Sequence, residues 1–221
     1  MQRTLATLFF LFALLLGGNY IASGSQSFNT GFAAAMAQTT GAEVDTSEIK
    51  EMMLGDENAP ITIVEYASFT CPHCARFHHE VFPQIKKNYI DTGKVKFILR
   101  DVYFDRFGLW ASMLARCGGE VRYFGIADLI FQDQKGWLAG GDPAKATANL
   151  RTIGKTAGLS DDQLDACFAD QDKAKALVAW YQKHAEEDGL EGTPSFIING
   201  QKYGNMSYAD FAKVLDEKLA Q

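Results

Sequence analysis

The stretch Glu65-Tyr-Ala-Ser-Phe-Thr-Cys71-Pro-His-Cys74 brings two cysteines, separated by two residues, to the predicted junction of a strand and a helix. The β-branched run 61–64 before it is typical of a buried strand. After it, apolar residues recur at spacings of three and four from Phe77 to Tyr89, which predicts a helix. The cysteines are therefore expected at a helix N-terminus, where unpaired N–H groups and the helix dipole favour a thiolate.

Two cysteines at this spacing can close a small disulfide ring, which favours a dithiol–disulfide redox centre. A zinc site is the first alternative, with His78 or His79 as a third ligand, but it needs a fourth ligand and usually a second ligand pair. The other cysteines, Cys117 and Cys167, stand apart from each other and from histidine. Covalent haem attachment needs histidine where the chain has Ala75. A purely structural bridge would constrain only four residues.

The composition is that of a globular protein with one domain, or one domain with an insertion. The chain has 221 residues, of which 47% are hydrophobic and 12% aromatic, enough for a sizeable core. Its net charge is −6, and no block of lysine or arginine occurs. Both features argue against nucleic acid as a partner.

The N-terminus has the pattern of a secretory signal. An apolar run, 5–16, follows a positively charged start, and the first acidic residue is Glu43. We interpret residues 1–37 as signal peptide and leader, with cleavage expected after the small-residue pattern at 35–37 or at 22–24.

An uncleaved membrane anchor over residues 4–22 is the alternative, although glycines and an asparagine interrupt it. In both cases the protein is exported, and we expect a periplasmic location. Disulfides persist in such an oxidising compartment.

Residues 94–99, after Gly93, predict a second strand. The strand–helix–strand order is a βαβ unit, with parallel strands and a right-handed crossover. Upstream, residues 25–47 are interpreted as a flexible leader, and the segment 47–54 as a short helix or an edge segment.

The pattern changes to helical over about 107–184, where four helices are expected, one of them capped by Ser160. A strand returns at 194–198, and Asn199–Gly200 signals a tight hairpin to the next strand. A helix from about Tyr208 closes the chain. The predicted class is α/β, a thioredoxin-like fold (βαβ, then ββα) with an all-helical insertion.

Three features of the predicted fold resemble the DsbA family of periplasmic thiol:disulfide oxidoreductases, of the type found in alphaproteobacteria. They are the motif Cys71-Pro72-His73-Cys74, Glu65 six residues before the first cysteine, and the Thr193–Pro194 dipeptide after a glycine. The resemblance covers residues 50–221. It implies a cis peptide bond at Pro194 and a backbone at Thr193 that pairs with the substrate chain in a sequence-tolerant way.

Within that resemblance, Cys71 is expected on the exposed side of the turn as the attacking and attacked sulfur, and Cys74 one turn deeper as the resolving thiol. Pro72 and His73 are expected to tune the redox centre, with His73 stabilising the Cys71 thiolate. Glu65 is expected to assist proton transfer at Cys74 as a buried carboxylate.

Each of the other cysteines, Cys117 and Cys167, lies on the apolar side of a predicted helix. We predict a structural disulfide between them, closing a loop of about 50 residues and worth roughly 4 kcal/mol in the chain-entropy model. Two buried free thiols are the alternative. His78 and His79 are expected beside the groove with no role, and His184 at the surface.

The predicted function is a thiol:disulfide oxidase that donates the Cys71–Cys74 disulfide to unfolded exported proteins, as a monomer without cofactor or metal. The resemblance implies re-oxidation by a DsbB-type quinone-linked membrane oxidase. One alternative is an isomerase or reductase of the DsbC or DsbG kind, which needs an N-terminal dimerisation domain longer than the segment 25–54. The other is a peptide-binding chaperone whose disulfide is incidental.

Overall fold

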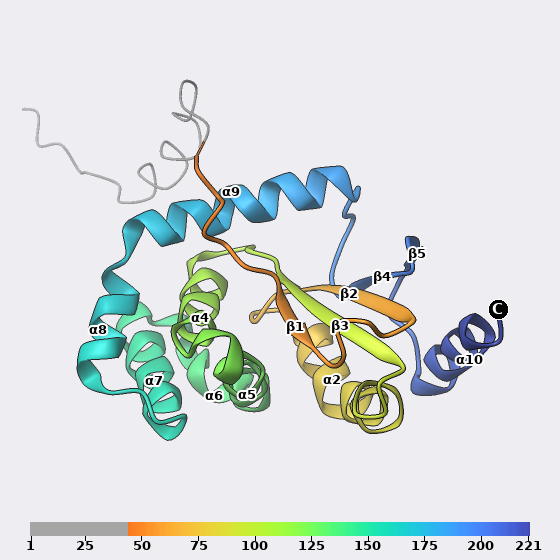
Figure 1. Cartoon of the computed structure of the whole chain (residues 1–221). Coiled ribbons are helices and arrows are strands. Elements are labelled where there is room, and N and C mark those ends of the chain that lie inside the picture. Colours follow the sequence, from red (N-terminus) through yellow and green to blue (C-terminus); the bar gives the residue numbers. More distant parts are fainter. Residues whose placement is uncertain (1–43) are drawn as a thin grey trace, which may run out of the picture. The chain divides into compact units, whose positions relative to one another are not determined.

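Five strands form one mixed sheet in the order β1-β3-β2-β4-β5 (Figure 1). Their bounds are Met52–Leu54 for β1, Ile61–Ala67 for β2, Val95–Asp101 for β3, Ser195–Ile198 for β4 and Gln201–Tyr203 for β5. β2 and β3 are parallel, and the other neighbouring pairs are antiparallel. The thioredoxin-like βαβ and ββα units are thus confirmed, and the segment before the first central strand is an edge strand.

This computed structural model describes residues 44–221, so the predicted signal peptide and leader, 1–37, and the alternative anchor lie outside the described residues. The helices are α2 Pro72–Glu80, α3 Phe82–Ile85, a π-helical turn Lys86–Ile90, α4 Arg106–Cys117, α5 Gly119–Gln132, α6 Gln134–Trp137, a 3-10 turn Ala139–Gly141, α7 Pro143–Thr156, α8 Asp161–Ala169, α9 Gln171–Glu187 and α10 Tyr208–Leu219. Within residues 44–221, no helix combines the length and the hydropathy that crossing a membrane requires.

The two faces of the sheet pack against different helices, because successive residues of a strand point in opposite directions. On one face, Ile63 enters the main core with residues of α2 and α10. There the Phe77 ring lies 4.8 Å from that of Phe196 and 5.6 Å from that of Phe211, between centroids. On the other face, Tyr66 belongs to a smaller cluster with residues from α9 and the loop after it.

The helix after the cysteines is shorter than its apolar stripe suggests. α2 ends before Val81, and the chain continues through α3 and the π-helical turn. Pro83 explains the break, because it has no N–H to donate to the preceding turn and its ring clashes there. The stripe itself is still buried, since Phe82, Ile85 and Tyr89 are all in the core.

The helices from α4 to α8 gather beside one end of the sheet, and α9 runs back from them toward β4 (Figure 1). The predicted cap at Ser160 is present as a full capping box with Gln163. α7 is not among the four helices predicted for this region, which lie around 110–117, 126–131, 160–168 and 177–181, because its buried positions, such as Ala146 and Gly154, give a weak apolar stripe. Its N-terminal signal was visible, since Asp142 accepts from two backbone N–H groups and Pro143 follows.

A buried ion pair fastens the helices to the sheet. Asp101, at the end of β3, lies 3.0 Å from the Nη2 of Arg116 on α4, and both side chains are 2% exposed. The Tyr123 hydroxyl of α5 donates to the other Asp101 oxygen at 2.7 Å. Because Asp101 pairs with Ala67 at the end of β2, this network fixes the insertion next to the loop that leads into α2.

Candidate active site

Cys71 lies at the N-cap of α2, immediately after the loop that follows β2. Its own N–H donates to the Ser68 carbonyl at 3.1 Å, which closes the turn, and Pro72 begins the helix with the fixed φ that this position favours. Cys71 is only 7% exposed and Cys74 is fully buried. Cys71 is thus the more accessible of the two cysteines, but it is buried, and the expectation that it is exposed is wrong.

A distant part of the chain lies against Cys71. The Thr193 carbonyl oxygen lies 3.6 Å from the Cys71 sulfur, across 122 residues of sequence. The Thr193–Pro194 peptide bond is cis, and Pro194 is buried. A cavity of about 490 Å³ opens next to this loop, lined by Tyr66 and by the segments 188–197 and 202–204.

Hydrogen bonds lower the pKa of Cys71 to about 5. The largest contribution is the hydrogen bond from the Cys74 thiol, which burial partly opposes. The Thr193 side chain and the backbone N–H groups of Cys74 and His73 add to it. At neutral pH this site therefore favours a thiolate on Cys71.

Cys74 behaves in the opposite way. Burial, first, and then its hydrogen bond to Cys71 and the negative charge of Glu65 raise its pKa above the ordinary range of a thiol. The two cysteines are thus unequal, with a stable thiolate on the outer residue, Cys71, and a stable thiol on the fully buried Cys74. Such a pair can attack through the outer sulfur and resolve through the inner one.

The predicted tuning residues occupy different positions around this pair. Pro72 and His73 are exposed in the first turn of α2, and the contribution of His73 to the Cys71 pKa comes from its backbone N–H. A role for its imidazole stays a prediction. Glu65 is fully buried on β2, close enough to Cys74 for its charge to raise the pKa of that thiol.

His78, for which no role was predicted, is the hydrogen-bond partner of Glu65. Its Nε2 lies 2.9 Å from the Glu65 Oε2, and both side chains are buried. The signal was available, because His78 is four residues after Cys74 and so shares its helix face. His79 points elsewhere, to the Phe131 carbonyl, and His184, expected at the surface, is partly buried against Trp180.

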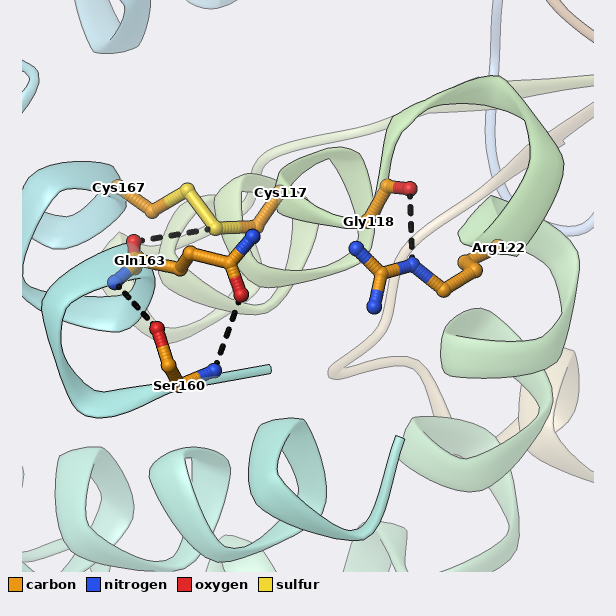
Figure 2. Close-up of a disulfide and its surroundings, with 6 residues drawn as sticks. All are labelled: Cys117, Gly118, Arg122, Ser160, Gln163 and Cys167. Carbon is orange, nitrogen blue, oxygen red and sulfur yellow. Dashed lines mark hydrogen bonds between the residues drawn. A yellow bond between two sulfur atoms is a disulfide. The ribbon is translucent and has the colours of Figure 1, made fainter. Parts of the chain in front are cut away.

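The second cysteine pair, Cys117 and Cys167, is joined in a disulfide (Figure 2). Its Cα atoms are 5.9 Å apart, and it ties the end of α4 to α8. Figure 2 shows the capping box of Ser160 and Gln163 beside the bridge, with hydrogen bonds of 3.0 and 3.2 Å between the two residues. The bridge thus lies beside the start of α8, which the capping box stabilises.

Comparisons with known proteins agree with this site. A family model described as Thioredoxin matches residues 47–217. A Rickettsia bellii protein, assigned as a protein-disulfide oxidoreductase, is 33% identical over 172 residues, which cover 77% of this chain and 65% of the length of that relative. Disulfide bond formation protein D of Bacillus subtilis is 27% identical over 179 residues, covering 75% of each chain. The crystal structure of Wolbachia pipientis alpha-DsbA1 matches with a TM-score of 0.73 and 32% identity, covering 78% of this chain and 92% of that one.

Proposed function

The chain belongs to the DsbA family of thioredoxin-fold protein-disulfide oxidoreductases, and we propose that it is an oxidase that donates the Cys71–Cys74 disulfide to exported proteins. The observation that supports this direction is the contrast between the two thiols. The pKa of Cys71 is lowered to about 5, while that of Cys74 is raised. A stabilised thiolate stabilises the reduced form, so that the disulfide form readily gives its oxidising equivalents away.

The reaction begins when a client thiolate attacks the Cys71 sulfur of the disulfide. The bond between the two active-site sulfurs breaks, its electron pair goes to Cys74, and the client is held on Cys71 as a mixed disulfide. A second client thiolate then attacks the client sulfur and releases Cys71 as a thiolate, which is a good leaving group because its pKa is low. The client loses two electrons, and the active-site pair gains them.

The client chain would be held by the loop before Pro194. Thr193 lies directly against the Cys71 sulfur, so a peptide bonded to Cys71 passes its backbone. Backbone pairing gives affinity without selecting side chains, which suits clients of many sequences. The cavity next to this loop offers space for a client side chain.

Export to the periplasm and re-oxidation by a DsbB-type quinone-linked membrane oxidase are part of this proposal, on family grounds. So are the structural role of the Cys117–Cys167 bridge and a monomeric state. The clients are proposed to be unfolded exported proteins. The name of the Bacillus subtilis relative, disulfide bond formation protein D, supports the reaction type.

The test is the equilibrium of the Cys71–Cys74 pair with glutathione buffers of graded ratio, read by alkylation and mass shift. We expect the pair to stay reduced until the buffer is far more oxidising than the roughly −270 mV at which thioredoxin equilibrates. Equilibration near that value would instead support a reductase. A dimer active on scrambled ribonuclease would indicate an isomerase, and a Cys71→Ala variant with full biological activity would indicate a chaperone.

A further inference from the structure

One of the two carboxylate oxygens of Glu65 is buried without a hydrogen-bond partner in the described part of the chain. The side chain has no exposed surface, and its Oε2 is paired with His78. Its Oε1 is equally buried and has no hydrogen-bond partner in the described part of the chain. Because a buried carboxylate oxygen without a partner is unfavourable, it calls for a functional explanation.

The carboxylate is held in place by its partner. The His78 imidazole stacks on the Phe131 ring, with centroids 4.1 Å apart and 12° between the planes. The rings of Phe77 and Phe82 enclose it further, at 5.4 and 4.9 Å between centroids. These neighbours carry no charge, and the imidazole cannot turn away from Glu65 without losing these contacts.

Cys74 is the titratable group that responds to this carboxylate. Four residues separate it from His78 on α2, so both side chains emerge from one face of the helix. The charge of Glu65 contributes to the raised pKa of Cys74, which places the carboxylate and the thiol within electrostatic reach.

We propose that His78 is a positioning residue that holds Glu65 Oε2, so that Oε1 is free to exchange a proton with the sulfur of Cys74. This inference rests on the proposed function and on the proton transfer that the family resemblance implies for Glu65; what it adds is the role of His78. It concerns the enzyme's own proton transfer, however, and applies in either direction of electron flow.

The proton and electron balance is as follows. When a client thiolate displaces Cys74 from the disulfide, the buried thiolate takes a proton from the Glu65–His78 pair. During re-oxidation by a disulfide-carrying oxidant, the Cys71 thiolate attacks that disulfide, and the Cys74 thiol returns its proton to Glu65 Oε1. The Cys74 thiolate then attacks Cys71 and expels the thiolate of the oxidant. The pair lowers the barrier because it places a base next to a buried thiol, which hydroxide reaches only slowly.

The test follows the resolution of a mixed disulfide by Cys74. The reduced protein is mixed with oxidised glutathione and quenched in acid, and the dithiol, Cys71-glutathione and disulfide forms are separated by mass between pH 5 and 8. We expect His78→Gln to slow resolution at least about tenfold at pH 6.5, since general acid–base groups contribute 10²- to 10⁴-fold. The rate in the variant should then rise with pH, because hydroxide must remove the proton that a misplaced Glu65 no longer accepts. Alkylation of Cys71 by iodoacetamide should stay within about twofold of the unmodified protein.

His79→Gln is the matched control, on the adjacent exposed position, and should resolve at the unmodified rate. Glu65→Gln is the second arm, which keeps a hydrogen bond to His78 but removes the base, and it should slow the same step. The double variant should be no slower than the slower single variant, because the two residues act as one unit.

Resolution within twofold of the unmodified protein in His78→Gln, or in Glu65→Gln if the first variant does not fold, overturns the inference. An equilibrium near thioredoxin with a pair-dependent resolution step would instead remove the oxidase proposal and leave this inference standing.

Discussion

Reduction of the Cys71–Cys74 disulfide is expected to stabilise the folded protein, and to do so increasingly as the pH rises from 5 to 8. The reason is the Cys71 thiolate. Its pKa is about 5 in the folded protein and about 8.5 in an unfolded chain, so the folded state favours the charged form. A pKa that is lower in the folded state contributes stability that is full above the unfolded pKa and is lost as the pH falls through the folded one.

The magnitude follows from the distance between pH 7 and the folded pKa. Two pH units at 1.36 kcal/mol each give about 2.7 kcal/mol at pH 7. Solvent near the sulfur screens part of this, so we expect about 1–3 kcal/mol, equivalent to roughly 20–65 mV in the potential of a two-electron couple. Cys74 does not alter the trend below pH 8, because its thiol stays protonated in the folded protein and largely so in the unfolded chain.

The assay is equilibrium unfolding in denaturant of the dithiol and the disulfide forms at pH 4.5, 5.5, 6.5 and 7.5. The difference in unfolding free energy between the two forms should increase with pH in favour of the dithiol, by at most about 1.4 kcal/mol per unit. Thiolate absorbance near 240 nm in the folded dithiol form should appear around pH 5. A reduced Cys71→Ala variant serves as the control and should lose the pH trend. A difference that is flat between pH 5 and 8, with Cys71→Ala identical to the unmodified dithiol form, would refute the reasoning.

Three further predictions concern single contacts. Cys74→Ala should raise the pKa of Cys71 toward the ordinary value, because the hydrogen bond that lowers this pKa most is lost. The pH dependence of Cys71 alkylation measures this pKa, and an unchanged midpoint of that curve contradicts the prediction. Arg116→Leu should destabilise the fold by about 3–5 kcal/mol in denaturant unfolding, because it leaves a buried carboxylate on β3 unpaired; a loss below 1 kcal/mol would show that the carboxylate simply takes up a proton. The Cys117→Ala, Cys167→Ala double variant should lose up to about 4 kcal/mol while the active-site potential stays constant, and a shifted potential would contradict a purely structural bridge.

Much of the fold could be predicted from the sequence, because its decisive signals are local. The spacing of the two cysteines after a β-branched run places them at the start of α2. The Asn199–Gly200 turn has positive φ at both residues, as the tight hairpin between β4 and β5 requires, and this pair of residues adopts that conformation readily. Hydrophobic periodicity gave most of the helices, and it failed at α7, where small side chains are buried and the apolar stripe is weak.

The chemistry of the site depends on contacts that no local pattern contains. The Thr193 carbonyl lies against Cys71 across 122 residues of sequence, and the sulfur that the sequence suggests is exposed is largely buried. In the sequence, His78 is one of two neighbouring histidines on a predicted helix. Only the packing of α2 against β2 brings its imidazole into hydrogen-bond contact with Glu65. The sequence by itself therefore determined the reactive groups and their order along the chain, because backbone geometry acts over a few residues. The tertiary structure decided how far apart the two thiol pKa values lie and which histidine pairs with Glu65, because pKa values respond to burial and to charges brought together by the fold.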